Sequence, residues 1–394
     1  MKSKEAGRLL IAYKRTFVIL LTVAMLGWQA QSASPQSASP QSGQSQSPQA
    51  TPVLEGLDPV MLVKGKEVQG ELNITVTRGQ FQYLFASEES KAAFEKEPAR
   101  YEIQLGGACA RMGPPVAGNP DLFAVHKERI YIFGSANCKT VFQAAPEKYL
   151  ETEETSQAAT PDAIKKGQSL IEKAVSAMGG AARLDALANY QEQRKAMQHR
   201  HSGDVEIKYV TTVVFPNQSR YEETGPDYKQ VIVITPSESF GFSPASSRPA
   251  ASLPAMVRQG YEKQLARNPL IILKNRKESN FKAFAAGPDK IGDTVVEQVA
   301  IESNGLKVKL GIDPATGRVL SLSFKGRGSG GAVGQITRTY SDFRTVDGLV
   351  LPFKIASTFN GESDSQISTT IETITVNGQI APAAFEKPKT GGVQ

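Results

Sequence analysis

Tyr131 to Tyr149 reads YIFGSANCKTVFQAAPEKY, and a closely similar stretch, YLFASEESKAAFEKEPARY, runs from Tyr83 to Tyr101. Seven pairs of positions carry the same residue at this fixed offset: Tyr83/Tyr131, Phe85/Phe133, Ser87/Ser135, Lys91/Lys139, Phe94/Phe142, Pro98/Pro146 and Tyr101/Tyr149. Such a repeat indicates one supersecondary unit used twice. Each copy is typical of a short strand, a serine N-cap, a helix of roughly two to three turns and a proline that ends the helix.

The charge of the 394-residue chain is concentrated at its start. The formal net charge is +6, and the first 32 residues hold five basic side chains against one acid, Glu5. Those five are Lys2, Lys4, Arg8, Lys14 and Arg15. The remaining sequence is close to neutral, so the composition gives no support for nucleic-acid binding.

Residues 1–33 are typical of a secretory signal peptide. A basic start precedes an apolar run from Thr16 to Trp28, which is too short for an ordinary membrane span of about 20 residues. Small residues near Ala30 to Ser32 offer a cleavage site, and an uncleaved N-terminal anchor is the alternative. We therefore expect a periplasmic or secreted protein with no transmembrane span after signal cleavage. Residues 34–52 are rich in Ser, Pro and Gln and predict a disordered linker.

The stretch 53–153 resembles a YHS domain. The resemblance rests on GLDPV at 56–60, the first repeat copy, GGACA at 106–110 and the second copy, in that order. The second copy also resembles the metal-binding TRASH relatives, whose usual motif is Cys-Ser-x-x-Cys. This chain has Gly134 at the first of those cysteines, and its first copy has Ala86 and Ser90 at the two positions.

The two cysteines are the chemically active residues of this stretch. If Ser135 is the N-cap, Cys138 is the third helical residue, where the helix dipole favours a thiolate. Export favours a Cys109–Cys138 disulfide, and free thiols and a soft metal ion such as copper(I) are the alternatives. A closed zinc site needs four ligands, and only His126 is available besides the two thiols. His126 itself is more typical of a solvent-facing strand histidine.

A second domain is expected over 161–388, after a linker at 154–160 and before a disordered tail at 389–394. Thr160 and Pro161 open a helix that Gly179 and Gly180 close, and a second short helix is expected over 183–188. Another helix is expected over 252–265, with a short apolar run beside it. The rest predicts antiparallel strands at 205–213, 228–235, 294–303, 306–312, 319–324, 334–343, 349–359 and 366–376. Their turns, such as Ser303-Asn304-Gly305, are typical of hairpins.

This second domain resembles outer-membrane lipoprotein-sorting proteins of the LolA/LolB type. The resemblance rests on IDPATGRVLSLSF, DFRTVDGLVLPFKI and ITVNGQIAPAAFEKP. It implies a half-open β-barrel whose sheet wraps covering helices around an apolar cavity for acyl chains. The expected fold class is thus α+β, a small duplicated strand-helix domain followed by that half-open barrel. Six apolar residues are candidates to line the cavity, with ordinary core packing as the alternative: Met256, Leu265, Leu270, Ile271, Ile272 and Leu273.

Motifs typical of catalysis do not occur in the sequence. Gly326, Gly328 and Gly331 spell G-x-G-x-x-G, but strands flank them on both sides, so we expect a hairpin loop. His199 and His201 alternate on one strand beside a turn and are more typical of a solvated hairpin end than of a metal site. G-x-S-x-G, H-E-x-x-H and P-loop patterns are missing from the sequence, which is not typical of an enzyme.

The sequence therefore predicts an exported, non-catalytic binding protein of the bacterial envelope. We expect it to carry or sense a hydrophobic ligand, either a lipid or a lipidated protein, with an envelope protein as a further partner. The expectation includes no cofactor. The alternative is a periplasmic metal-handling protein that holds copper or another soft metal at Cys109 and Cys138.

Overall fold

The computed structural model describes residues 52–114, 116–151, 159–200, 203–328, 330–363 and 367–388. The expected signal peptide, nearly all of the linker at 34–52, the linker residues 154–158 and the tail at 389–394 lie outside the described residues. We call residues 53–151 the front module and residues 160–388 the sheet module. No helix among the described residues is both long and apolar enough to cross a membrane.

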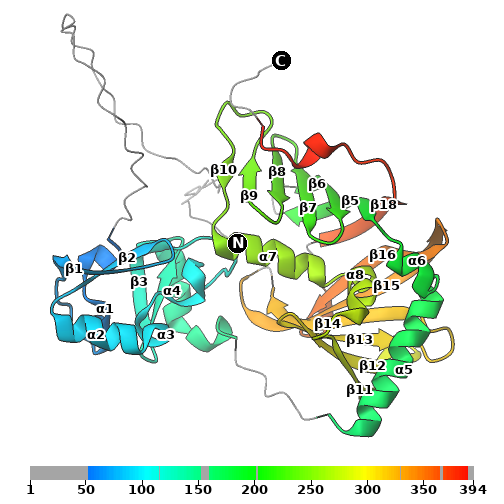
Figure 1. The fold of residues 1–394 in the computed structure, drawn as a ribbon, viewed down its shortest axis with the longest axis horizontal. Coiled ribbons are helices and arrows are strands. Elements are labelled where there is room, and N and C mark those ends of the chain that lie inside the picture. The colour runs from blue at the N-terminus through cyan, green and yellow to red at the C-terminus, as the bar shows by residue number, and fades with distance from the viewer. Residues whose placement is uncertain are drawn as a thin grey trace, which may run out of the picture. The chain divides into compact units, whose positions relative to one another are not determined.

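The two repeat copies of the front module fold into equivalent elements, each a β-hairpin followed by a nine-residue helix (Figure 1). The first copy, with the strand before it, comprises β1 (Glu71–Arg78), β2 (Phe81–Phe85), α2 (Glu88–Lys96) and α3 (Pro98–Tyr101). The second, likewise with the strand before it, comprises β3 (Asn119–His126), β4 (Arg129–Phe133), α4 (Ala136–Ala144) and the 3-10 turn η3 (Pro146–Lys148). The N-caps are as predicted, because Ser87 and Ser135 each accept a hydrogen bond from the amide three residues later. Both prolines begin the next helical turn.

The repeated aromatic residues form the centre of each copy. The rings of Phe85 and Phe94 lie 5.2 Å apart, and their counterparts Phe133 and Phe142 lie 5.1 Å apart. All four side chains are at most 1% exposed. The repeat in the sequence therefore encodes the same packing contact twice, between the last strand of the hairpin and the helix that follows it.

Asp58 connects two elements of the front module. Its side chain caps α1 (Pro59–Val63) by accepting from the amides of Val60 and Met61 at 2.8 and 3.1 Å. Its second oxygen accepts from the amide of Ala86 at 2.9 Å, just before α2. The GLDPV motif thus places a fully buried carboxylate where three backbone amides satisfy it.

The sheet module contains one large antiparallel sheet of fourteen strands. Its strand order is β10-β9-β8-β7-β6-β5-β18-β16-β15-β14-β13-β12-β11, with β17 paired to β16. The strands β10 and β11 lie at opposite ends of this order, and in the described part of the chain they do not pair with each other. The sheet is therefore open, and the prediction of a large open antiparallel sheet is confirmed. The strands are β5 (Asn189–Arg200), β6 (Gly203–Val214), β7 (Gln218–Thr224), β8 (Lys229–Ile234), β9 (Ser239–Phe242), β10 (Ala251–Ser252), β11 (Lys282–Ile291), β12 (Thr294–Ser303), β13 (Leu306–Ile312), β14 (Val319–Arg327), β15 (Val333–Val346), β16 (Leu349–Phe359), β17 (Glu362–Ser363) and β18 (Ile367–Val376).

The helices of the sheet module are α5 (Pro161–Met178), α6 (Ala181–Asp185), α7 (Ala255–Ala266) and α8 (Pro269–Lys274). In Figure 1, α5 runs beside β11 and β12, and α7 and α8 lie in front of the middle strands of the sheet. The main apolar core lies between α5, α8 and the sheet, and includes Val175, Leu273, Leu310 and Leu322. This layering follows from the apolar stripe of α5, which can be buried only against the sheet.

The predicted elements differ from the structure in a few places. The strand β5 was expected only at its end, around His199, because its sequence NYQEQRKAMQHR has no simple apolar alternation. The strands β7, β9, β10, β11 and β17 were not expected. The apolar run at 270–273 forms the helix α8, since Asn268 caps it and Pro269 occupies its first turn. The second short helix is α6, two residues earlier than predicted. The G-x-G-x-x-G loop is the β14–β15 hairpin turn, as predicted.

Candidate functional site

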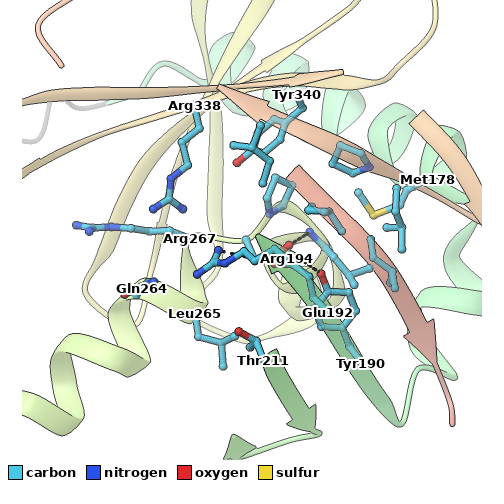
Figure 2. Close-up of a pocket in the computed structure, with 18 of the residues that line it drawn as sticks. Met178, Tyr190, Glu192, Arg194, Thr211, Gln264, Leu265, Arg267, Arg338 and Tyr340 are labelled. Atoms are coloured by element: carbon cyan, nitrogen blue, oxygen red, sulfur yellow. Dashed lines mark hydrogen bonds and ion pairs between the residues drawn. The ribbon is translucent and has the colours of Figure 1, made fainter. Parts of the chain in front are cut away.

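A cavity of about 90 Å³ lies between the sheet and the α7–α8 segment (Figure 2). Strands from both halves of the sheet contribute to it, with the end of α5 and the connection between α7 and α8. The lining residues are Met178, Tyr190, Glu192, Arg194, Thr211, Tyr221, Gln264, Leu265, Arg267, Asn268, Pro269, Leu270, Arg338, Tyr340, Leu351, Pro352, Ile355, Ile371 and Ile374.

One side of the cavity is apolar. Met178, Leu270 and Leu351 come from α5, α8 and β16 and belong to the main core. On β18, Ile371 and Ile374 both line the cavity although they are three residues apart. A register shift between Ile371 and Thr373 explains this, because the extra residue of a bulge lets two side chains at odd spacing share one face.

The other side of the cavity is charged. Tyr190, Glu192 and Arg194 alternate along β5 and therefore share one face of the sheet. Glu192 is only 7% exposed, accepts a hydrogen bond from the Tyr190 hydroxyl and lies 3.7 Å from Arg194 Nη1. Burial, and then the nearby Glu192 charge, raise the pKa of Tyr190 well above its ordinary value. This pair is therefore a neutral phenol that donates to a carboxylate.

Arg267 and Arg338 complete the charged side. Their guanidinium carbons lie 3.9 and 5.2 Å from the centroid of the Phe324 ring. Arg267 donates from Nη2 to the Lys325 carbonyl oxygen at 3.3 Å, whereas its buried Nε has no hydrogen-bond partner among the described residues. Burial, and then the positive charge of Arg338, lower the pKa of Arg267 to about 10. The site is therefore short of negative charge.

The six predicted lining residues separate into two groups. Leu265 and Leu270 line the cavity. Met256, Ile271, Ile272 and Leu273 are buried but do not line it, and Ile272 and Leu273 pack in the main core. Successive residues of a helix point in different directions, so a run of four on α8 cannot all face one cavity.

Sequence reasoning missed the charged and aromatic lining residues. Arg194 and Tyr190 lie on the part of β5 that was not predicted, and Arg267 lies in the short connection between two helices. The sequence contained only a weak indication of these lining residues. Arg338 and Tyr340 stand two apart on β15, the spacing of a shared strand face, but many exposed strands carry the same pattern.

A second hollow lies at the edge of the sheet module. It has a volume of about 920 Å³, opens to solvent and lies between α5, the start of β11 and the segment after α8. Ile164, Ile171, Phe281 and Phe284 line it together with the charged Glu172, Arg276 and Lys282. The cavity beneath α7 and α8 is the smaller of the two, but polar groups converge on one side of it and apolar groups line the other, so we take it as the candidate ligand site.

Cys109 and Cys138 lie together in the core of the second repeat copy. Both are buried free thiols and pack with Phe133 and Phe142. Arg111 donates from Nη1 to the Cys138 sulfur at 3.9 Å. Burial by itself would raise the pKa of the Cys138 thiol, but hydrogen bonds with Ser135, Arg111 and Cys109 outweigh burial and lower that pKa. The pair can therefore support thiolate chemistry.

His126 does not join the two thiols. Its Nε2 lies 3.0 Å from Glu147 Oε1, and its ring contacts Phe142. In the part of the chain that the structure describes, no three His, Cys, Asp or Glu side chains are grouped to hold a metal ion. The side chains of His199 and His201 lie outside the described residues.

Thiol counting tests the state of the two cysteines. Protein purified without reductant and then denatured is expected to expose no reactive thiol if Cys109 and Cys138 form a disulfide, and two thiols after reduction. A Cys138→Ser variant should show one thiol, Cys109, under both conditions. Two reactive thiols in the unreduced wild-type protein would contradict the predicted disulfide.

The fold and the cavity together define a class of protein: a mixed α+β protein whose open antiparallel sheet bears a partly apolar cavity beneath covering helices. No protein-family model matches the sequence, and no curated protein matches it significantly.

Solved structures resemble about half of the chain. A LolA superfamily protein from Nitrosomonas europaea is 15% identical, and the match covers 56% of this chain and 97% of that one at a TM-score of 0.38. A DUF1329 family protein from Desulfovibrio piger is 10% identical, with 57% and 98% covered and a TM-score of 0.37. A domain described as an outer membrane lipoprotein-sorting protein, from Vibrio parahaemolyticus, is 11% identical, with 56% and 97% covered and a TM-score of 0.36. The YHS-like interpretation of the front module stays a prediction.

Proposed function

We propose that this chain is an exported, non-catalytic protein that carries or senses a hydrophobic ligand, either a lipid or the acyl chain of a lipidated protein. The observation that carries the proposal is the cavity between the sheet and the α7–α8 segment, with its apolar side formed by Met178, Leu351 and Ile374. Apolar surface in such a cavity is favourably covered by a hydrocarbon chain. An envelope protein is the expected partner for loading or release.

The size of the cavity constrains the mechanism. At about 90 Å³ it is far below the roughly 300–1,000 Å³ typical of ligand sites, so a whole acyl chain does not fit in this closed form. Loading therefore requires a covering element to move. Helix α7 is the natural one, because only Met256 of its twelve residues is buried, whereas α8 buries five of six. An element with few buried apolar contacts opens at the lowest cost.

Ligand content and dye binding test this function. Purified protein is expected to release a lipid in denaturing mass spectrometry, or, once stripped, to enhance the fluorescence of 1-N-phenylnaphthylamine. Leu265→Trp should weaken dye binding by about tenfold, because the larger side chain fills the cavity. The control is Leu72→Trp, the same exchange at a side chain that is 82% exposed on β1. Protein that carries no lipid and binds no dye would contradict the proposal.

The juxtaposed thiols support a second candidate function. We propose that the reduced Cys109 and Cys138 bind a soft monovalent metal ion such as copper(I), for which two thiolates suffice. Copper(I) titration against a chromogenic chelator, with and without prior reduction, tests this. Binding of one ion per reduced chain that is lost in Cys138→Ser supports the candidate, and equal binding by the variant contradicts it.

A further inference from the structure

Three arginine side chains line the charged side of the cavity. Figure 2 shows the side chains of Arg194, Arg267 and Arg338 at the cavity. They come from β5, β15 and the α7–α8 connection, so distant parts of the sheet module supply them. Among the residues that the structure describes, Glu192 is the only carboxylate that lines the cavity. The lining therefore has an excess of positive charge.

Existing contacts compensate this charge only in part. Arg194 has Glu192 at 3.7 Å and stacks on the Tyr209 ring at 4.9 Å. Among the described residues, neither Arg267 nor Arg338 has a carboxylate at ion-pair distance, and both instead lie over one aromatic ring, that of Phe324. Glu151 acts on Arg267 through space but does not line the cavity.

An unpaired charge removed from water is costly, and like charges beside it add to the cost. Burial, and then repulsion from Arg194, lower the pKa of Arg338, and the attraction of Tyr340 and Glu192 offsets this lowering only in part. The buried Nε of Arg267 is a donor without a partner among the described residues. A ligand oxygen anion would supply both the missing acceptor and the missing negative charge, since guanidinium groups match carboxylate and phosphate oxygens closely.

We infer that Arg194, Arg267 and Arg338 bind the anionic group of an amphiphilic ligand, a carboxylate or a phosphate, while the apolar side of the cavity takes the adjoining end of its hydrocarbon chain. This inference rests on the proposed function and specifies its ligand class. The small volume agrees with it, because about 90 Å³ suits a compact charged group and not a whole lipid.

A series of ligands with one chain and different head groups tests the inference. Dodecanoate, dodecyl phosphate and uncharged dodecanol are titrated below their aggregation limits, with isothermal calorimetry as the readout. At least one of the two anionic ligands is expected to bind about 10- to 100-fold more tightly than dodecanol, the range for charge-assisted hydrogen bonds. Their relative affinities tell whether the site prefers a carboxylate or a phosphate.

Substitutions that replace one arginine by an uncharged residue test which side chains cause the preference for the anionic ligand. Arg267→Gln and Arg338→Gln are each expected to reduce the preference for the anionic ligand by about tenfold while dodecanol binding changes little. The control is Arg344→Gln on the same strand as Arg338, where the side chain is 54% exposed and paired with Asp342. It should keep the full preference. The wild-type comparison decides the question even if a variant does not fold.

The outcomes separate the two proposals. Equal binding of all three ligands by the wild-type protein would overturn the anionic site but leave the hydrophobic carrier standing. Binding of none of them would overturn the carrier itself. Inorganic phosphate that binds as tightly as dodecyl phosphate would overturn the head-group assignment, because the chain would then contribute nothing.

Discussion

Replacing Gly167 with alanine is expected to destabilise the sheet module by about 2 kcal/mol, even though alanine is the better helix former. Gly167 lies in α5, where the helix crosses β11. A methyl group there would come within 2.5 Å of the Phe284 Cα and 2.7 Å of its carbonyl carbon. These are backbone atoms of a strand and cannot rotate away.

The gain in helix propensity and the cost of overpacking oppose each other, and the larger of the two decides whether Gly167→Ala lowers the stability. Alanine gains about 1 kcal/mol of helix propensity over glycine, whereas overpacking against an unyielding neighbour costs about 1–3 kcal/mol or more. A clash with backbone falls at the upper end. Calorimetry or circular dichroism of thermal unfolding measures the result. Ser169→Ala, at an exposed site two residues later, is the control and should be neutral or slightly stabilising. A Gly167→Ala protein more stable than wild type would refute the close packing of α5 on β11.

Replacing Asp58 with alanine is expected to destabilise the front module by about 3 kcal/mol. The carboxylate is fully buried and accepts from three backbone amides, those of Val60, Met61 and Ala86. Its removal leaves donors without partners, at about 1–3 kcal/mol for each one that water cannot reach. Two of the three hydrogen bonds, those from Val60 and Met61, form the N-cap of α1, whose loss alone costs about 1 kcal/mol.

A matched exchange separates this effect from a general loss of charge. Asp121 also accepts from a backbone amide, that of Glu55 at 2.9 Å, but this bond is exposed. Asp121→Ala should therefore cost less than about 1 kcal/mol, because water replaces the lost acceptor. Asp58→Asn should fall between the two, since it keeps one acceptor oxygen. Chemical unfolding followed by circular dichroism measures all three, and an equal loss for Asp58→Ala and Asp121→Ala would contradict the role assigned to Asp58.

Local signals in the sequence predicted many elements of the fold. Thr160 caps α5 as expected by accepting from the Ala163 amide, and α5 spans 161–178 between that cap and Gly179. The strands 294–303, 306–312 and 349–359 match the prediction, because left-handed turn residues such as Asn304 and Asn360 bound them. Capping and turn formation depend on a few neighbouring residues, which the sequence displays directly.

The candidate site was much less accessible to prediction. Of the six expected lining residues, Leu265 and Leu270 line the cavity, since apolar character alone does not tell a cavity wall from a packed core. The register shift in β18 that turns Ile371 and Ile374 to one face has no clear sequence signature. The volume of the cavity depends on how well side chains from many strands fill the same space.

By itself, the sequence determined where many of the helices and hairpins of this protein begin and end, and that the front module uses one packing unit twice, because caps, turns and repeated aromatic residues act over short distances. The tertiary structure alone decided that Arg194, Arg267 and Arg338 share one cavity with Glu192. Those arginines are far apart in the chain, and only the pairing order of the strands, with the placement of α7 and α8 against them, brings their charges together.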